Sequence, residues 1–158
     1  MKFIKTLLVL SFFSIMFLTT ACEDNETVDT PPENATLSGT ITFIGTWPDT
    51  GAVAVSLSST WPPQGAPAAS TVITSADLSN NTYTYTFENV TFGSYASIAV
   101  SWEDPNDTNP MSNQHPLGVY GATAEADFMD ATSVTVTETE YELTGLSFDA
   151  DLSLATSN

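Results

Sequence analysis

The sequence lacks arginine altogether, and its two lysines, Lys2 and Lys5, both lie at the N-terminus. Residues 22–158 therefore carry no Lys or Arg, although they hold all 19 Asp and Glu residues of the chain. Nucleic-acid binding depends on basic side chains that displace the counterions of the phosphates. We therefore expect no nucleic-acid partner, no binding to anionic lipids through a basic patch, and no phosphate site that relies on Lys or Arg.

Cysteine and histidine occur once each, as Cys22 and His115. A single cysteine excludes a disulfide within the chain, and one histidine leaves no ligand set for a structural zinc site of the usual kind. The nucleophile motif Gly-x-Ser-x-Gly is also absent from the sequence. We therefore predict that the protein is not an enzyme and has no catalytic residues. A small hydrolase is the alternative from another functional class.

Residues 1–21 have the order of a secretory signal, with a basic start, an apolar run and small residues. The apolar run of residues 7–18 is shorter than the roughly 20 residues that a membrane-spanning helix needs. We therefore predict a signal helix that ends just before Cys22. This order resembles the lipobox of bacterial lipoproteins, although Thr19 stands where that family usually has Leu. The resemblance implies acyl chains such as palmitate on Cys22; the alternative is a plain signal peptide with an incidental cysteine.

Residues 22–34 are polar and acidic and contain Pro31-Pro32, which predicts a disordered tether. Its first residues after the cysteine are Glu23-Asp24-Asn25-Glu26. Such a run resembles the surface-export signal of lipoproteins in the Bacteroidota group. The resemblance implies a protein of the outer membrane that is displayed on the cell surface, with its membrane contact made by acyl chains. A periplasm-facing lipoprotein with a solvated linker is the alternative.

Residues 35–158 predict one all-β domain, a seven-stranded antiparallel β-sandwich. Short runs in which apolar residues alternate with Thr or Ser are separated by Gly, Pro and Asn, as is typical of half-buried strands. Residues 103–133 are predicted to form one long irregular segment, of a length that often carries function. We place the strands at residues 36–43, 53–57, 71–74, 83–87, 96–102, 134–143 and 146–152.

The stretch 83–100 has the pattern strand, Gly-x-Tyr, strand, in which Gly93 and Tyr95 occupy the Gly and Tyr places. This pattern resembles the core of carboxypeptidase regulatory-like and transthyretin-like (prealbumin-like) domains. Residues 38–41 and 144–152 resemble their first and last strands, whereas residues 103–133 are longer than in that family. The resemblance implies a prealbumin-like sandwich that serves as a non-catalytic spacer, binding or assembly module.

The loop after the predicted fifth strand gathers oxygen-bearing side chains. Because residues 22–158 hold no Lys or Arg, the nearest counter-charges available to their carboxylates are cations from solution. Hard oxygen ligands crowded in a loop are what Ca²⁺ takes, and this ion is the one cofactor that we consider. The alternative is a solvated acidic turn, since Asp, Asn and Pro build turns by themselves. The candidate ligands are Glu103, Asp104, Asn106, Asp107 and Asn109.

Two tryptophans, Trp47 and Trp102, are candidate ligand-binding residues. Antiparallel strand order puts the loops after the first and fifth strands at the same end, which would bring Trp47 near Trp102 and the acidic loop. An exposed ring beside carboxylates and amides can hold a sugar, whereas packing in the core is the other interpretation. The leading function is therefore a surface lipoprotein that acts as a non-catalytic binding or structural module. The alternative is calcium-assisted glycan binding, and glycans or other surface proteins are the candidate partners.

Overall fold

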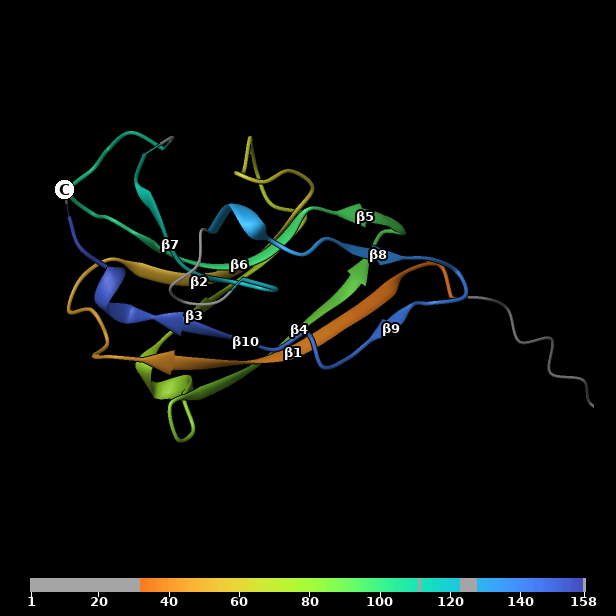
Figure 1. The fold of residues 1–158 in the computed structure, drawn as a ribbon, viewed down its shortest axis with the longest axis horizontal. Coiled ribbons are helices and arrows are strands. Elements are labelled where there is room, and N and C mark those ends of the chain that lie inside the picture. Colours follow the sequence, from red (N-terminus) through yellow and green to blue (C-terminus); the bar gives the residue numbers. More distant parts are fainter. Residues whose placement is uncertain (1–31, 111, 123–127, 158) are drawn as a thin grey trace, which may run out of the picture.

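The computed structural model describes residues 32–110, 112–122 and 128–157. The predicted signal segment, Cys22 and the tether up to Pro31 lie outside the described residues. The described part is all-β, with ten strands and three short 3-10 helices (Figure 1). The elements are β1 (Ala35–Ile44), β2 (Ala52–Ser58), β3 (Ala69–Ile73), η1 (Ser75–Asp77), β4 (Thr82–Val90), β5 (Gly93–Tyr95), β6 (Ser97–Glu103), β7 (Gln114–Val119), η2 (Phe128–Asp130), β8 (Val134–Val136), β9 (Glu142–Leu143), β10 (Phe148–Asp151) and η3 (Leu152–Leu154).

The first sheet is built around β1, in the order β10-β1-β4, with β9 paired to the start of β1. Strand β4 is antiparallel to β1, with Gly39 opposite Tyr85. Strands β9 and β10 run parallel to β1, with Ile41 opposite Phe148 in the β10 pair. The prediction of a purely antiparallel fold is therefore wrong, because the last two strands, β9 and β10, pair with β1 in the parallel orientation.

The second sheet has the order β3-β2-β6-β7, and all of its pairs are antiparallel. A separate two-stranded sheet joins β5 to β8. The two four-stranded sheets lie over each other in Figure 1, and one hydrophobic core contains residues from both. The domain is therefore β-sandwich-like, and alternation along β1 and β2 supplies the buried side chains between the sheets.

Tyr85 ties the last part of the chain to the first sheet. Its side chain is buried, and its hydroxyl donates a hydrogen bond of 2.5 Å to the carbonyl of Leu146. Burial raises the pKa of this phenol far above its usual range, and the neighbouring Tyr120 phenol contributes in the same direction. A Cβ at Gly39 would lie 2.1 Å from the same Leu146 carbonyl oxygen. Position 39 therefore has no room for a side chain where the segment between β9 and β10 crosses β1.

The predicted irregular segment 103–133 contains the regular strand β7, which corrects that prediction. Alternation fails as a signal there because His115 and Pro116 are half-buried while Leu117, Gly118 and Val119 are all buried. A Cβ at Gly118 would lie 2.2 Å from the Asp149 carbonyl oxygen, so that β7 packs directly against β10. The predicted strand 134–143 is likewise divided into β8 and β9. Reciprocal hydrogen bonds between the backbones of Thr137 and Glu140 form the turn that divides them.

The sandwich has two distinct ends. The tether end, at the right of Figure 1, comprises residues 33–36, 88–95 and 134–143, and it includes the start of β1. The far end, at the left, comprises residues 45–51, 104–110, 112–113 and 155–157. No helix in the described ranges is long and apolar enough to cross a membrane.

Candidate functional site

Three segments that are distant in sequence meet at the far end. The indole N–H of Trp102 donates a 2.7 Å hydrogen bond to the carbonyl of Thr50, which lies in the loop that carries Trp47. The hydroxyl of Ser157 donates to Asp104 Oδ1 at 3.0 Å, and the Asn106 side-chain amide donates to the Ser157 hydroxyl at 3.2 Å. These contacts confirm the prediction that the loops after the first strand and after β6 share one end, and they add the C-terminal segment.

Trp102 is buried, with 2 % of its surface exposed. Its ring packs against His115 at a centroid distance of 5.4 Å and an interplanar angle of 57°. Gly51 allows the loop above to close, because it has a positive φ of 82° and a Cβ there would lie 2.2 Å from Trp102 Nε1. Trp102 therefore offers no free ring face to a sugar. It is a core residue, which was the alternative interpretation.

Trp47 lies at the edge of the core and is half-buried. It meets Phe43 edge-on, with ring centroids 5.3 Å apart and an interplanar angle of 66°. This contact is an ordinary aromatic pair, of the kind that contributes about 0.5–1.5 kcal/mol beyond burial. Of the two predicted ligand-binding tryptophans, Trp102 is buried and Trp47 is partly buried.

Asp104 is an unusual aspartate because only 3 % of its surface is exposed. Its Oδ1 accepts hydrogen bonds from the Asn106 N–H at 2.9 Å and from the Ser157 hydroxyl at 3.0 Å. Both donors are neutral, and the sequence places no Lys or Arg after residue 5. Burial of a carboxylate without a compensating charge is costly, because the lost hydration is only partly replaced.

Asn113 is a residue that sequence reasoning missed. It is 8 % exposed, and its side-chain Oδ1 is buried with no hydrogen-bond partner in the described part of the chain. Its Nδ2 donates to Glu103 Oε1 at 3.4 Å. Its backbone carbonyl accepts a hydrogen bond from the Asp104 N–H at 2.8 Å. The residue was missed because β7, which sets its position, was predicted to be irregular.

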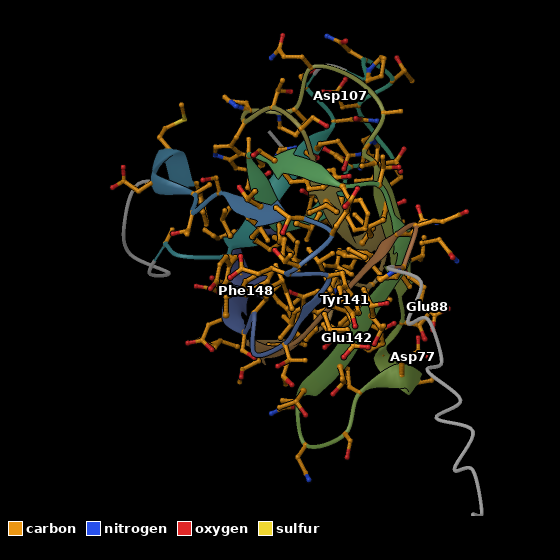
Figure 2. All side chains as sticks on the ribbon, turned by 90° about the vertical axis from the view of Figure 1, so that its right-hand side faces the viewer. Asp77, Glu88, Asp107, Tyr141, Glu142 and Phe148 are labelled. Atoms are coloured by element: carbon orange, nitrogen blue, oxygen red, sulfur yellow. The ribbon has the colours of Figure 1, made fainter. Side chains whose placement is uncertain are left out.

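Asp107 and Asn109 form the outer turn of the loop instead of facing Asp104. The Ser112 hydroxyl donates to Asp107 Oδ2 at 2.6 Å, and the Asn109 N–H donates to Asp107 Oδ1 at 2.9 Å. These two hydrogen bonds, in that order of importance, lower the pKa of Asp107, and the charge of nearby His115 lowers it further. Figure 2 shows Asp107 near the top of the molecule. Asp107 and Asn109 therefore fit the alternative of a solvated acidic turn.

The five predicted calcium ligands thus fall into separate environments. Glu103 is exposed at the end of β6, Asp104 is buried, and Asn106, Asp107 and Asn109 lie along the loop. Within residues 32–110, 112–122 and 128–157, no group of three or more His, Cys, Asp or Glu side chains is arranged to hold a metal. The calcium hypothesis therefore depends on Asp104 and its immediate neighbours.

Comparisons with known proteins found no matching family model, no matching curated protein and no matching solved structure. The resemblance to bacterial lipoproteins and to prealbumin-like domains therefore stays a prediction from the sequence motifs.

Proposed function

We propose that the protein is a lipid-anchored lipoprotein of the outer membrane, displayed on the cell surface, whose β-sandwich acts as a non-catalytic binding or structural module. The observation that carries the proposal is the order of the N-terminal segments. The expected export signal ends just before Cys22, an acidic stretch follows, and the central strand β1 begins at Ala35. Acyl chains on Cys22 would supply the membrane affinity, at about 0.8 kcal/mol for each buried CH₂ group.

The arrangement of the two ends supports this function. The chain enters the sandwich at the tether end, while the loops of the far end lie on the opposite side (Figure 1). An anchor on Cys22 would therefore hold the tether end toward the membrane and present the far end outward. This orientation is the one expected of a module that contacts partners in the surroundings of the cell.

The prealbumin-like fold is part of the proposal, and its Gly-x-Tyr element has a physical role in the structure. Tyr95 is buried except for 7 % of its surface, and its hydroxyl donates a 2.6 Å hydrogen bond to the Thr91 carbonyl. Gly93, in β5, has a φ of 154° and open space where a Cβ would lie. These features support a tight return of the chain at this point, which is the role that the resemblance assigns to the motif.

The non-catalytic assignment rests on the environment of the single histidine. His115 is half-buried and packs on the Trp102 ring. The glycan-binding alternative loses one of its two aromatic rings, because Trp102 is buried.

The anchor is tested by fractionation and intact-mass measurement of the native protein, together with a Cys22→Ala variant. We expect the wild-type protein in the outer membrane with its N-terminus at an acylated Cys22, and we expect the variant to lose membrane association. A Thr27→Ala variant, altered in the tether only, serves as the matched control. A polypeptide that begins at Met1 and stays in the cytosolic fraction would contradict the proposal.

Surface display is tested with a protease added to intact cells. Trypsin is unsuitable because residues 22–158 contain no Lys or Arg, so a Glu-specific protease is used, for which Glu23, Glu26 and Glu33 provide sites in the tether. We expect release of the domain from intact cells. Protection in intact cells, with cleavage only after the outer membrane is opened, would assign the protein to the periplasmic face.

A further inference from the structure

We propose that the far end of the sandwich carries a binding site for one Ca²⁺ ion, whose buried protein ligands are the Asp104 carboxylate and the Asn113 side-chain carbonyl. The site is independent of the lipid anchor, because it stands on contacts within the folded domain alone. Of the five loop residues that the sequence suggested as ligands, the site keeps Asp104, and it adds Asn113, the residue just before β7.

Strand register places the two side chains on the same face. In the β6–β7 hairpin Trp102 is opposite His115, and Glu103 is opposite Gln114. The next pair along is Asp104 and Asn113, joined by the 2.8 Å hydrogen bond from the Asp104 N–H to the Asn113 carbonyl. Side chains alternate between faces along a strand, so Asp104 and Asn113 share the face of the buried Trp102. The two residues therefore lie side by side just beyond the ends of β6 and β7, at the far end of the core.

The Asp104 carboxylate lacks a counter-charge from Lys or Arg, and the Asn113 side-chain carbonyl lacks a hydrogen-bond donor among the residues that the structure describes. The hydrogen bonds to the Asp104 carboxylate that connect it with other described residues both reach Oδ1, which leaves Oδ2 free to coordinate. Asn113 Oδ1 is buried and has no donor in the same described ranges. A buried carbonyl oxygen without a partner destabilises the fold, and so does a largely buried carboxylate with no cation beside it. One cation between the two oxygens removes both costs.

The cation has to come from solution, because the folded domain contains no Lys or Arg. The formal net charge of −17 also raises the local concentration of cations around the molecule. A bound water molecule would satisfy the Asn113 carbonyl, but it would leave the carboxylate charge uncompensated. The net charge and the buried acceptors therefore favour an ion over a water molecule.

The ligand chemistry favours Ca²⁺ among the common divalent ions. All available ligands are hard oxygens, and Ca²⁺ accepts carboxylate, amide carbonyl and water oxygens in flexible geometry at about 2.3–2.6 Å. Mg²⁺ is less suited, because it requires near-ideal octahedral geometry and gives up its water reluctantly. Glu103, whose Oε1 is 3.4 Å from Asn113 Nδ2, adds a second negative charge beside the site. A site with so few protein ligands is expected to have an affinity of about 10⁻⁴–10⁻³ M, as in extracellular modules.

The site also holds the C-terminal segment. Ser157 donates its hydroxyl to the Asp104 carboxylate and accepts from the Asn106 side-chain amide. A cation that fixes Asp104 therefore fixes the strand end, the loop and residue 157 together. Binding should reduce the motion of the C-terminal segment as well as raise the thermal stability of the domain.

The test uses the full chain purified in detergent and freed of divalent ions, with CaCl₂ compared against NaCl of matched ionic strength. We expect a saturable rise in melting temperature with CaCl₂ and one ion bound per chain by calorimetry. Terbium, a luminescent substitute for Ca²⁺, should show emission sensitised by the adjacent Trp102, and Ca²⁺ should displace it. A CaCl₂ response no larger than that of matched NaCl, with no saturable binding, would overturn the proposal.

Three variants separate a ligand role from a structural one. Asp104→Asn keeps the shape of the side chain and should weaken Ca²⁺ binding by about tenfold or more, because it removes the ligand charge. Asn113→Asp should strengthen binding by about tenfold and lower the melting temperature without calcium, because it adds a second buried charge. The control Glu138→Gln removes one carboxylate at the tether end and should bind as the wild type does. Wild-type affinity in both Asp104→Asn and Asn113→Asp would overturn the site, even if either variant is less stable.

Discussion

The two ends of the sandwich carry the same kind of charge but place it differently. At the tether end, Glu88 on β4 and Glu142 on β9 are exposed on the two strands that flank β1, and Figure 2 views the molecule from this end. At the far end, Asp104 is buried beside the unpartnered Asn113 carbonyl. Water alone can solvate the exposed carboxylates. The domain holds no Lys or Arg, so the largely buried Asp104 is the acid that gains most from a cation taken from solution.

The largest expected effect concerns the closure of the far end over Trp102. Gly51→Ala combines a positive φ of 82° with a Cβ only 2.2 Å from Trp102 Nε1 and 2.4 Å from the Glu103 carbonyl oxygen. We expect a loss of about 3 kcal/mol or more in the free energy of unfolding, measured by urea denaturation. Gly145→Ala is the matched control, since its φ is 73° but nothing lies within 4 Å of the added Cβ.

In the Gly145→Ala control, the free energy of unfolding should fall only by the cost of a left-handed backbone conformation, about 1–2 kcal/mol. The difference between the two variants therefore isolates the packing of the loop on the indole. Equal losses would mean that the far end is not closed by this contact, and the burial of Trp102 would then need another cause.

A smaller effect is expected at the tether end from Tyr95→Phe. The substitution removes the hydroxyl that donates to the Thr91 carbonyl at 2.6 Å and keeps the buried ring. We expect a loss of about 1 kcal/mol in the free energy of unfolding, with the response to calcium unchanged. A Tyr95→Phe protein that has lost its calcium response would show that the two ends are not independent, which would contradict the comparison above.

The pH dependence of stability should reflect the hydrogen-bonded aspartates. The pKa of Asp107 is lowered mainly by the Ser112 hydroxyl, the pKa of Asp151 by Ser153, and the pKa of Asp77 by Thr74. A lowered folded-state pKa contributes stability that is present above the unfolded value of about 3.9 and is lost as the pH falls through the folded value. We therefore expect the free energy of unfolding to fall below about pH 4 on account of these groups.

Ser112→Ala tests the cause of the Asp107 shift. Carboxyl NMR titration should show that the pKa of Asp107 moves up toward the ordinary aspartate value, because the main hydrogen bond is gone. The pKa of Asp77 should stay where it is, since its partner Thr74 is unchanged. An unmoved Asp107 pKa would assign the shift to the Asn109 N–H or to His115 instead.

The smallest effect is expected from Glu142→Gln at the tether end. An exposed carboxylate in a protein of this charge adds to self-repulsion, so its neutralisation should raise stability at low salt by less than about 0.5 kcal/mol. At 1 M NaCl, where the Debye length is about 3 Å, the gain should disappear. Thermal melting at the two salt concentrations measures it, and a gain that survives high salt would point to a local contact instead of long-range repulsion.

Part of the fold was predictable because strict alternation marks strands that bury one face. Leu37, Ile41 and Phe43 in β1 and Val53, Val55 and Leu57 in β2 are buried as the alternation predicts. Strand β7 was not predictable in this way, because its last three residues are all buried where it packs against β10. Its omission also hid Asn113, since the partner of Asp104 is defined only once β7 exists.

The site was therefore half predictable. The acidic loop after β6 and its place beside the first loop follow from composition and strand order. The burial of Trp102 and Asp104 does not, because it depends on how the loop at Gly51 and the C-terminal Ser157 fold over them. A glycine before a strand and a serine near the C-terminus are common in sequences. Their presence alone does not predict that these segments pack over Trp102 and Asp104.

The most direct test of the difference between the two ends is a calcium titration followed by amide chemical shifts of the ¹⁵N-labelled full chain. The account predicts saturable shifts confined to the far end, at Asp104, Asn113 and Ser157, with Glu88 and Glu142 unchanged. Shifts spread over the exposed acids of both ends without saturation would show only diffuse counterion binding and would contradict a calcium site at Asp104 and Asn113.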